Sequence, residues 1–372
     1  MKKILIVINT RFVPFGGLTS VMMNYFRAMN KEDLQIDFAS TNNPPDELLK
    51  ELQEAGSRYY NLGRRKNIPQ YILHLFRLIR KNQYDVIHIN GNSASMVLDL
   101  LPASWLRTPF RIAHTHSMNT MHSFLHQMFR PLIKKVSNCY LAASDDAGRW
   151  LFDDGYVVLK NAIDVQKYQY SQSNRKKVRL EWGIKDQFVV GTVGKLNSEK
   201  NQMFLIRVFA QIVKKREDAI LIIAGGGPLE NELKLECKRL GITKSVLFLG
   251  MITNVETVLQ GFDVFVFPSI FEGFGMVVLE ALASGLKCYV SDSIPKASNV
   301  TGTVRYLKLS ESVEIWAEQI LNTVDYDREN ESENAMNAIT SHGYNIFHEA
   351  GTLRNIYMST KQIKWSRGHN SD

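Results

Sequence analysis

The stretch Val264–Gly285, VFVFPSIFEGFGMVVLEALASG, shows the unit from which this chain is built. Its first four residues are all apolar and predict a strand buried on both faces, since they lack the alternation of a half-exposed strand. Glycines follow, and Met276–Ala283 then carries a helical pattern. Glycines let the backbone approach a ligand closely, and the free N–H groups at a helix start favour anionic oxygens. We therefore expect chemistry at this turn.

Strand and helix patterns alternate along the whole chain, which predicts parallel sheets made of βαβ units. The expected strands are Ile4–Ile8, Val86–Ile89, Arg111–Ala113, Tyr140–Ala143, Val189–Val193, Ile220–Ala224, Val246–Leu249 and Val264–Phe267. The expected helices include Leu18–Met29, Pro69–Lys81, Gln202–Lys215, Pro228–Arg239 and Met276–Ala283.

The length of 372 residues indicates two domains of ordinary size. The alternation runs to about residue 160 and restarts near Phe188, and the polar stretch 165–186, which contains SQSNRKKVR, is predicted to connect the two parts. We expect an α/β protein with two doubly wound domains, 1–165 and 166–345, followed by a C-terminal helix and tail, 346–372. Ligands of such sheets lie at the carboxyl ends of the strands.

Composition places the chain among ordinary globular proteins, with 45% apolar and 22% charged residues. The net charge of +8 is uneven: the first 180 residues hold 25 Lys or Arg against 14 Asp or Glu, which gives +11, and the remainder has 20 against 23, which gives −3. This contrast indicates that the first half meets a large anionic surface, either nucleic acid or an acidic membrane leaflet.

The cysteines and the apolar runs point to the compartment. Cys139, Cys237 and Cys288 are widely spaced and include no CxxC pair, which favours a reducing compartment and gives no sign of a zinc site. The apolar run Ile4–Ile8 is too short for a signal-peptide core, and no stretch of about 18–20 apolar residues occurs. We expect a cytoplasmic protein.

Two glutamates mark the quoted stretch, Glu272 in the glycine turn and Glu280 in the helix. Eight residues span roughly 12 Å on a helix. That is beyond the ~5–9.5 Å between the carboxylates of a glycosidase. The two side chains should contact different parts of one long ligand. The alternative is a helix with two solvated glutamates.

The pattern EGFG…EALASG, with seven residues between the two glutamates, resembles the donor-site signature of family 4 glycosyltransferases. The resemblance covers nearly the whole chain and implies the GT-B fold, in which two Rossmann-like domains face a central cleft and the C-terminal one holds a sugar nucleotide. It implies that Glu272 contacts the donor sugar and Glu280 the ribose, with the turn Gly273, Phe274 and Gly275 at the donor.

Two further loops carry the resemblance. Gly194-Lys195-Leu196 with Lys200 is similar to the family's Gly-Arg-Leu and following lysine, which implies that the two cations hold the donor diphosphate. Lys195 keeps the charge of the usual arginine but not its planar fork. The turn ending in Gly227 resembles the family's glycine-proline turn on the nucleotide side. Without the resemblance, two solvated lysines and an ordinary βα turn would explain both.

In the first domain, Gly16 and Gly17 resemble the glycine pair that the family places at the donor phosphates, although Thr19 stands where an acidic residue is common. His116, with His114 second, matches a histidine that contacts the transferred sugar. The alternatives are a structural histidine and a metal pair. A metal pair lacks a third ligand nearby in sequence.

The segment Asn161–Asp164, Asn-Ala-Ile-Asp, is similar to the Asn-Gly-Ile-Asp stretch where the family's chain crosses to the second domain. We interpret it as a structural hinge marker.

The resemblance implies a retaining transfer from a nucleoside-diphosphate sugar, with UDP expected, to a lipid-diphosphate-linked or glycan acceptor in bacterial exopolysaccharide or capsule formation. Lys195, Lys200 and the glycine amides would stabilise the leaving diphosphate. No cofactor and no divalent metal are expected. Catalytic roles fall to His116, Glu272 and Lys200.

Basic amphipathic segments in the first half suggest peripheral binding to the inner face of the cell membrane. These are Ile68–Lys81, preceded by Arg64-Arg65-Lys66, and Met121–Lys135. The alternative is that both helices pack on the sheet with a solvated basic face.

Two other classes of function remain open at this stage. One is a nucleotide-sugar epimerase or phosphorylase of the same architecture. The other is a basic nucleic-acid-binding module, although no helix-turn-helix, RNA-recognition or zinc-finger pattern is present. We expect no nucleic acid partner.

Overall fold

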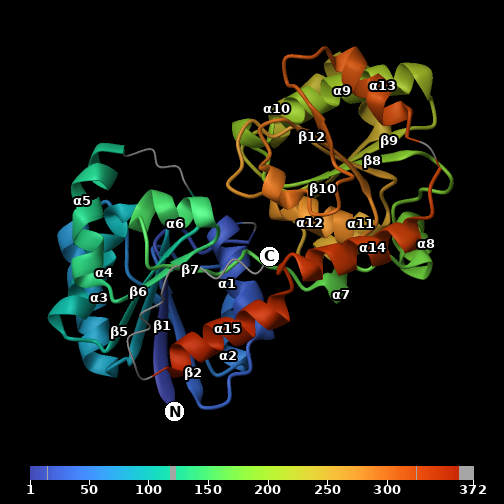
Figure 1. Ribbon diagram of the computed structural model, residues 1–372. Coiled ribbons are helices and arrows are strands. Elements are labelled where there is room, and N and C mark those ends of the chain that lie inside the picture. The colour runs from blue at the N-terminus through green and yellow to red at the C-terminus, as the bar shows by residue number, and fades with distance from the viewer. Residues whose placement is uncertain (15, 118–122, 324, 360–372) are drawn as a thin grey trace. The chain divides into compact units, whose positions relative to one another are not determined.

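A computed structural model describes residues 1–14, 16–117, 123–323 and 325–359. The chain forms two compact units, each an α/β layer structure (Figure 1). The first unit comprises Met1–Ala162 together with the C-terminal helix α15 (Ile346–Met358), and the second comprises Ile163–Asn345. Helix α15 packs against α1 (Gly17–Ala28), so the end of the chain returns to the unit that contains its beginning.

The first unit is built on a seven-stranded parallel sheet of order β3-β2-β1-β4-β5-β6-β7. Its strands are β1 (Lys2–Ile8), β2 (Leu34–Ser40), β3 (Tyr59–Asn61), β4 (Val86–Gly91), β5 (Phe110–Thr115), β6 (Cys139–Ala142) and β7 (Val157–Val158). Besides α1 and α15, its helices are α2 (Asp46–Glu54), α3 (Ile68–Asn82), η1 (Ala94–Met96), α4 (Val97–Trp105), α5 (Ser123–Val136) and α6 (Asp145–Phe152).

The second unit has a six-stranded parallel sheet of order β10-β9-β8-β11-β12-β13. Its strands are β8 (Val189–Val193), β9 (Ile220–Ala224), β10 (Val246–Gly250), β11 (Val264–Phe267), β12 (Lys287–Ser291) and β13 (Arg305–Leu307). Its helices are α7 (Val165–Tyr168), α8 (Gln172–Glu181), η2 (Ser198–Lys200), α9 (Gln202–Lys215), α10 (Glu230–Arg239), η3 (Thr243–Ser245), α11 (Val255–Gln260), α12 (Met276–Ala283), η4 (Lys296–Ser298), α13 (Val313–Leu321) and α14 (Arg328–Ser341).

The predicted α/β class with two parallel, doubly wound sheets is confirmed. All eight predicted strands are present. The apolar side chains of the second sheet pack into a core on each of its two faces. Strand β2 is absent from the prediction because Asp37 interrupts its apolar pattern. That buried carboxylate accepts hydrogen bonds from the Tyr84 hydroxyl at 2.7 Å and from the Arg58 N–H at 3.0 Å.

The prediction that residues 165–186 form a polar connection is wrong. This stretch folds into α7 and α8 of the second unit. Arg175 and Arg179 on α8 pair with Asp263, at 2.5 Å and 3.3 Å, and Asp263 also accepts the Val189 N–H. These cations brace the start of β8 and β11. They therefore do not belong to the basic charge of the first unit.

The strand order reverses between β1 and β4 in the first unit and between β8 and β11 in the second. At such a point the loops leaving the carboxyl ends of two adjacent strands run to opposite faces of the sheet. The predicted site residues follow these strands or their neighbours. The topology therefore directs attention to the loops after β1, β4 and β5, and after β8, β9 and β11.

A half-buried arginine on α14 ties the ends of α11 and α12 together in the second unit, and its removal should be costly. The Arg328 guanidinium donates to the carbonyl oxygens of Leu259, Gln260, Phe262 and Ser284 at 2.6–3.1 Å. Arg328→Met should lower the free energy of unfolding by roughly 3 kcal/mol, because it leaves buried carbonyls without donors. Urea denaturation measures this, with the exposed Arg305→Met as control. Equal stability of the two variants would contradict this account.

Candidate functional site

The loops after β8 and β11 are joined side by side at the switch point of the second sheet. The Glu199 carbonyl accepts hydrogen bonds from the Ser269 hydroxyl at 2.9 Å and from the Ile270 N–H at 2.7 Å. The Lys200 ammonium forms an ion pair with the Glu272 carboxylate, and the two side chains are only 21% and 12% exposed. Two of the predicted site residues, 72 positions apart, are therefore in direct contact.

The Ser269 hydroxyl also lies beside the carboxylate of this pair. Its hydroxyl lies 3.3 Å from Glu272 Oε1 and 3.0 Å from the Phe271 carbonyl oxygen. The Lys200 Nζ atom lies 5.2 Å from the centre of the Phe267 ring, at the end of β11. An ammonium has three N–H donors. One points to Glu272, and among the described residues the ammonium makes no other hydrogen bond, so the remaining donors can bind further oxygens.

The glycine turn after β9 packs directly on the loop that carries the lysines. Gly225 has φ of +136°, and a Cβ atom there would lie 1.9 Å from the Gly194 carbonyl oxygen. A Cβ atom on Gly227 would lie 2.3 Å from the Leu196 carbonyl oxygen. The Leu196 N–H donates to the Gly226 carbonyl at 3.1 Å. These glycines are thus required for the close packing of two loops at the sheet edge.

Lys195 differs from Lys200 in its surroundings. Its side chain is exposed, and in the part of the chain that the structure describes it has no ion-pair partner. Its carbonyl oxygen accepts a hydrogen bond from the Gln202 side chain at 2.9 Å, which ties the loop to the start of α9. The loop backbone is held firmly while the ammonium group remains accessible.

The turn before α12 combines conformational and packing roles. Gly275 adopts the left-handed conformation, with φ of 83° and ψ of 49°, and forms the N-cap of the helix. The Phe274 ring lies 5.1 Å from the Tyr344 ring and packs on the core of the second unit.

Glu280 lies in a different environment from Glu272. It projects from α12 toward α7, where it accepts a hydrogen bond from the Tyr168 side chain. Burial raises the pKa of Glu280 to about 7, and Tyr168 and Lys167 oppose that shift. The structure therefore separates the two predicted glutamates. One is paired with a lysine, and the other is a half-buried carboxyl whose pKa is raised to about 7.

In the first unit, the two glycines differ in their surroundings. Gly16 is the N-cap of α1, and a Cβ atom there would lie 3.1 Å from the Val13 carbonyl oxygen. A Cβ atom on Gly17 would meet nothing within 4 Å. Thr19, which stands in place of the expected acidic residue, accepts the Val13 N–H at 3.3 Å and holds the loop.

His116 follows β5 and is held at both ring nitrogens. Nε2 lies 3.0 Å from the Asn90 side-chain oxygen, and Nδ1 lies 3.2 Å from that of Asn161. Burial lowers the pKa of His116 to about 4, so the ring is neutral at physiological pH. His114 is fully buried and bonds His88 at 3.2 Å. Among the described residues, no three His, Cys, Asp or Glu side chains group to hold a metal ion.

Three residues of these loops escaped the sequence prediction: Ser269, Asn90 and Asn161. Each is a small polar residue at or just beyond the end of an apolar strand. That position is the one sequence signal from which a role at the site could have been predicted. Asn161 was interpreted as a hinge marker only. Its contact with His116 joins residues 45 positions apart and cannot be read from local spacing.

Models of two known families match most of both units. The model for glycosyl transferases group 1 matches residues 174–337, and the model for glycosyltransferase family 4 matches residues 15–167. The chain belongs to the family 4 glycosyltransferases.

Relatives of this glycosyltransferase extend over nearly its full length. A Bacillus subtilis protein named for glycosyltransferase activity, EpsF, is 29% identical over 95% of each chain. The Escherichia coli UDP-Gal:alpha-D-GlcNAc-diphosphoundecaprenol alpha-1,3-galactosyltransferase is 22% identical, over 95% of this chain and 96% of that enzyme. HepE of Anabaena, crystallised with UDP and glucose, has a TM-score of 0.76 at 18% identity, over 96% of this chain and 99% of that one. The likeness to HepE shows the GT-B fold.

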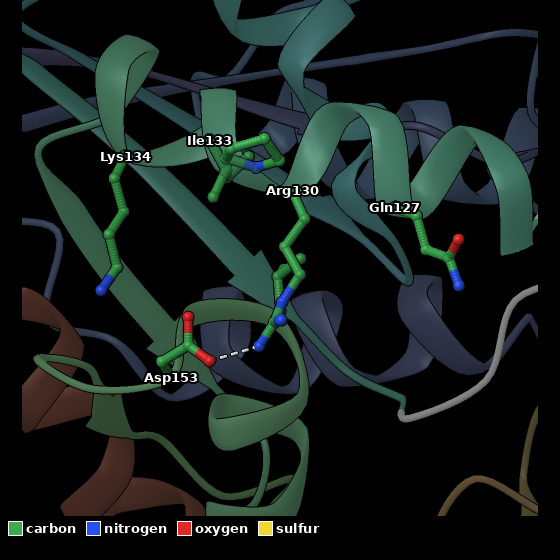
Figure 2. A pocket seen from close by; sticks show the side chains of 7 residues that line it. Gln127, Arg130, Ile133, Lys134 and Asp153 are labelled. Atoms are coloured by element: carbon green, nitrogen blue, oxygen red, sulfur yellow. Dashed lines mark hydrogen bonds and ion pairs between the residues drawn. The ribbon is translucent and has the colours of Figure 1, made fainter.

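The first unit of the glycosyltransferase also contains a pocket of about 290 Å³ between α5 and α6 (Figure 2). Arg130 points into it and pairs with Asp153 at 2.5 Å, and Lys134 pairs with Asp154 at 2.7 Å. Each cation of the pocket wall is thus neutralised by a carboxylate. The pocket has no excess positive charge with which to attract an anion.

The raised pKa of Glu280 predicts a pH-dependent cost to stability. An unfolded glutamate ionises near pH 4.5, whereas folded Glu280 ionises at about 7, so stability is lost as the pH rises through this interval. Glu280→Gln removes the titration. The variant should gain about 2–3 kcal/mol relative to the wild type between pH 5 and pH 8.

Urea denaturation at both pH values measures this difference. Glu318→Gln, an exposed carboxyl on α13, is the matched control and should show no such gain. A stability difference between Glu280→Gln and wild type that does not change with pH would refute the assignment.

Proposed function

We propose that this enzyme is a retaining glycosyltransferase that moves a sugar from a nucleoside-diphosphate sugar, with a UDP-sugar expected, to a lipid-linked or glycan acceptor in exopolysaccharide or capsule formation. The observation that carries the proposal is the contact between Lys200 and Glu272 at the switch point of the second sheet. A cation and a carboxylate placed together can bind both parts of such a donor, the diphosphate and the sugar hydroxyls.

The roles follow from the surroundings of each side chain. Lys200 keeps free N–H donors beside Glu272, and Lys195 presents an exposed ammonium from the same loop. In the proposal these two cations, with the loop amides near Gly227 and the start of α12, bind the diphosphate. Glu272 accepts hydrogen bonds from the donor sugar. Glu280 accepts them from the ribose.

Catalysis in this proposal is electrostatic. The sugar–phosphate bond breaks as the leaving diphosphate develops negative charge, and prearranged cations stabilise that charge more strongly than water does. The acceptor hydroxyl attacks from the same face and passes its proton to the departing phosphate oxygen. His116 contacts the transferred sugar from the first unit. The transfer needs no divalent metal on this account.

The choice of donor and acceptor rests on the relatives. The Escherichia coli relative is named for UDP-Gal and for a diphosphoundecaprenol-linked acceptor, and HepE was crystallised with UDP and glucose. The name EpsF belongs to a relative that matches this chain from end to end. These support a UDP-sugar donor and a lipid-linked acceptor for this chain.

Removal of the central cation should abolish transfer. Lys200→Ala should reduce kcat by about 10²–10³-fold, because it withdraws one charge from the developing anion. The assay is transfer of radiolabel from a panel of UDP-sugars into the lipid of a bacterial membrane fraction. Binding of UDP, measured by calorimetry, should weaken in parallel.

Lys287→Ala is the matched control. Lys287 forms a partly buried ion pair with Glu331 at 2.8 Å in the same unit, away from the switch loops. Both variants therefore leave one half-buried glutamate unpaired, and only Lys200→Ala should lose activity. Near wild-type transfer by Lys200→Ala would overturn the proposed function.

We further propose that the first unit binds an anionic membrane surface through the outer face of its α3–α4–α5 layer, where a lipid-linked acceptor would be found. Helix α3 packs on α4, and α4 packs on α5. Met121 and His122, at the start of the predicted second segment, lie outside the described residues. The layer exposes the large apolar side chains Ile68, Leu73, Trp105, Phe124, Leu125, Met128 and Leu132.

Charge complementarity favours a lipid surface as the occupant of this layer. Exposed cations stand beside the apolar side chains, and in the described ranges they have no carboxylate partner. They are Arg64, Lys66, Arg77, Arg80, Lys81 and Lys135. On α5, Phe124, Met128 and Leu132 form one stripe, because they are spaced four residues apart. No helix in the described part of the chain is long and apolar enough to cross a bilayer.

Membrane binding should depend on both kinds of side chain. Arg77→Gln, Arg80→Gln and Lys81→Gln combined should weaken binding to phosphatidylethanolamine–phosphatidylglycerol vesicles by about 100-fold, at roughly 1 kcal/mol for each basic residue. Phe124→Ser with Met128→Ser should weaken it similarly by removing apolar area. Vesicle flotation measures both.

The control is Leu235→Ser, an equally exposed leucine on α10 of the second unit, which should float like the wild type. Vesicles of phosphatidylcholine alone should bind the wild type weakly. Equal flotation on both vesicle types, or no loss in either combined variant, would refute the membrane surface and leave a solvated helical face.

A further inference from the structure

The imidazole of His116 is enclosed by two asparagines in a way that determines which nitrogen carries the proton. Asn90, at the end of β4, is fully buried, and its Nδ2 atom faces the His88 carbonyl oxygen at 3.5 Å. That orientation turns the Asn90 oxygen toward His116 Nε2, at 3.0 Å. Nε2 must then carry a hydrogen to donate.

A neutral imidazole has only one N–H group. With the hydrogen on Nε2, Nδ1 is a lone pair and needs a donor. Asn161 lies 3.2 Å from Nδ1 and is the side chain in contact with it. Oxygen and nitrogen of an asparagine amide are interchanged by a flip, so its NH₂ group satisfies Nδ1. Both ring nitrogens are then paired without a positive charge.

The other titratable groups around the ring keep it neutral. His114 packs against His116 with ring centres 3.9 Å apart and the ring planes tilted by 38°, and His88 bonds both His114 and the Tyr357 hydroxyl. Burial lowers the pKa values of His88 and His114. A charge on any of these rings would be repelled by a charge on its neighbour. No carboxylate of the described residues contacts these three histidine rings.

Asn161 belongs to the segment by which the chain leaves the first unit, since Ile163 begins the second. Side chains of α15 and α1 hold this segment. The Lys160 N–H donates to the Glu349 carboxylate at 2.8 Å, and the Lys160 carbonyl accepts from the Tyr25 hydroxyl at 2.5 Å. Burial raises the pKa values of Glu349 and Tyr25. Asn161 is thus on the segment that connects the two units, and its side chain contacts the imidazole of His116.

We propose that Asn90 and Asn161 are positioning residues for sugar transfer, which fix His116 with its proton on Nε2 and hold Nδ1 as an acceptor. This rests on the proposed role of His116 at the transferred sugar. A sugar hydroxyl takes the place of the Asn161 N–H and donates to the same lone pair, while Asn90 keeps the ring orientation. No bond is made or broken in this exchange apart from hydrogen bonds.

The test is nitrogen NMR of the full-length protein labelled on histidine, with the His116 signals assigned by their loss in His116→Gln. In the wild type, His116 should be the Nε2–H form and should resist protonation down to about pH 4. In Asn161→Asp the carboxylate cannot donate, so Nδ1 must gain a proton. The pKa of His116 should rise by about 1–3 units.

The matched control is Asn24→Asp, which places the same carboxylate near the same segment. Asn24 donates to the Ala162 carbonyl at 3.4 Å and does not touch His116. It should leave the His116 titration unchanged. An Nδ1–H form or a charged ring in the wild type at pH 7 overturns the proposal without any variant, so failure of Asn161→Asp to fold does not leave it untested.

Kinetics separate this inference from the proposed function. The acid limb of the pH profile of kcat for transfer from a UDP-sugar should move upward in Asn161→Asp by the shift that NMR records. If His116→Gln retains wild-type turnover, the proposed role of His116 fails. If His116→Gln loses turnover but Asn161→Asp titrates and reacts like the wild type, the positioning role of Asn161 is refuted and the role of His116 stands.

Discussion

The candidate donor site depends on one ion pair at one place in the topology. Strand order in the second sheet reverses between β8 and β11, so the loops after these strands would diverge. Lys200 and Glu272 hold them together, and Ser269 secures the same contact through the Glu199 carbonyl. Because both side chains are mostly buried, neither can be removed without leaving an unpaired charge.

Burial assigns different chemical properties to similar side chains. Glu272 is paired with a lysine, whereas Glu280, on the following helix α12, is a half-buried carboxyl with a pKa raised to about 7. His116 is a histidine by sequence, but its surroundings keep it neutral and use both ring nitrogens. In each case desolvation disfavours the charged form. The environment of a residue, and not its type, therefore determines what it can do in catalysis.

The fold was predictable because its strands and helices follow from hydrophobic patterns of residues close together in the sequence. Val264–Phe267 is a continuous apolar run and Val189–Val193 is mostly apolar, and a strand covered on both faces needs no other signal. The prediction failed where a polar residue is satisfied only by distant partners. Strand β2 was not predicted because it contains Asp37, whose carboxylate is satisfied by the distant Tyr84. The basic stretch 165–186 was interpreted as a connection because Asp263, which pairs with its arginines, lies over 80 residues away.

By itself the sequence determined the class of fold, the two sheets, the glycine turns and the family, because each depends on residues close together along the chain. Tertiary structure alone decided which side chains meet: Lys200 with Glu272, Gly225 with Gly194, and His116 with Asn90 and Asn161. Parallel strands bring the ends of distant segments to one edge of a sheet, and burial there lowers the pKa of His116. Neither the contacts nor this pKa shift can be read from spacing, since both are properties of the packed sheet.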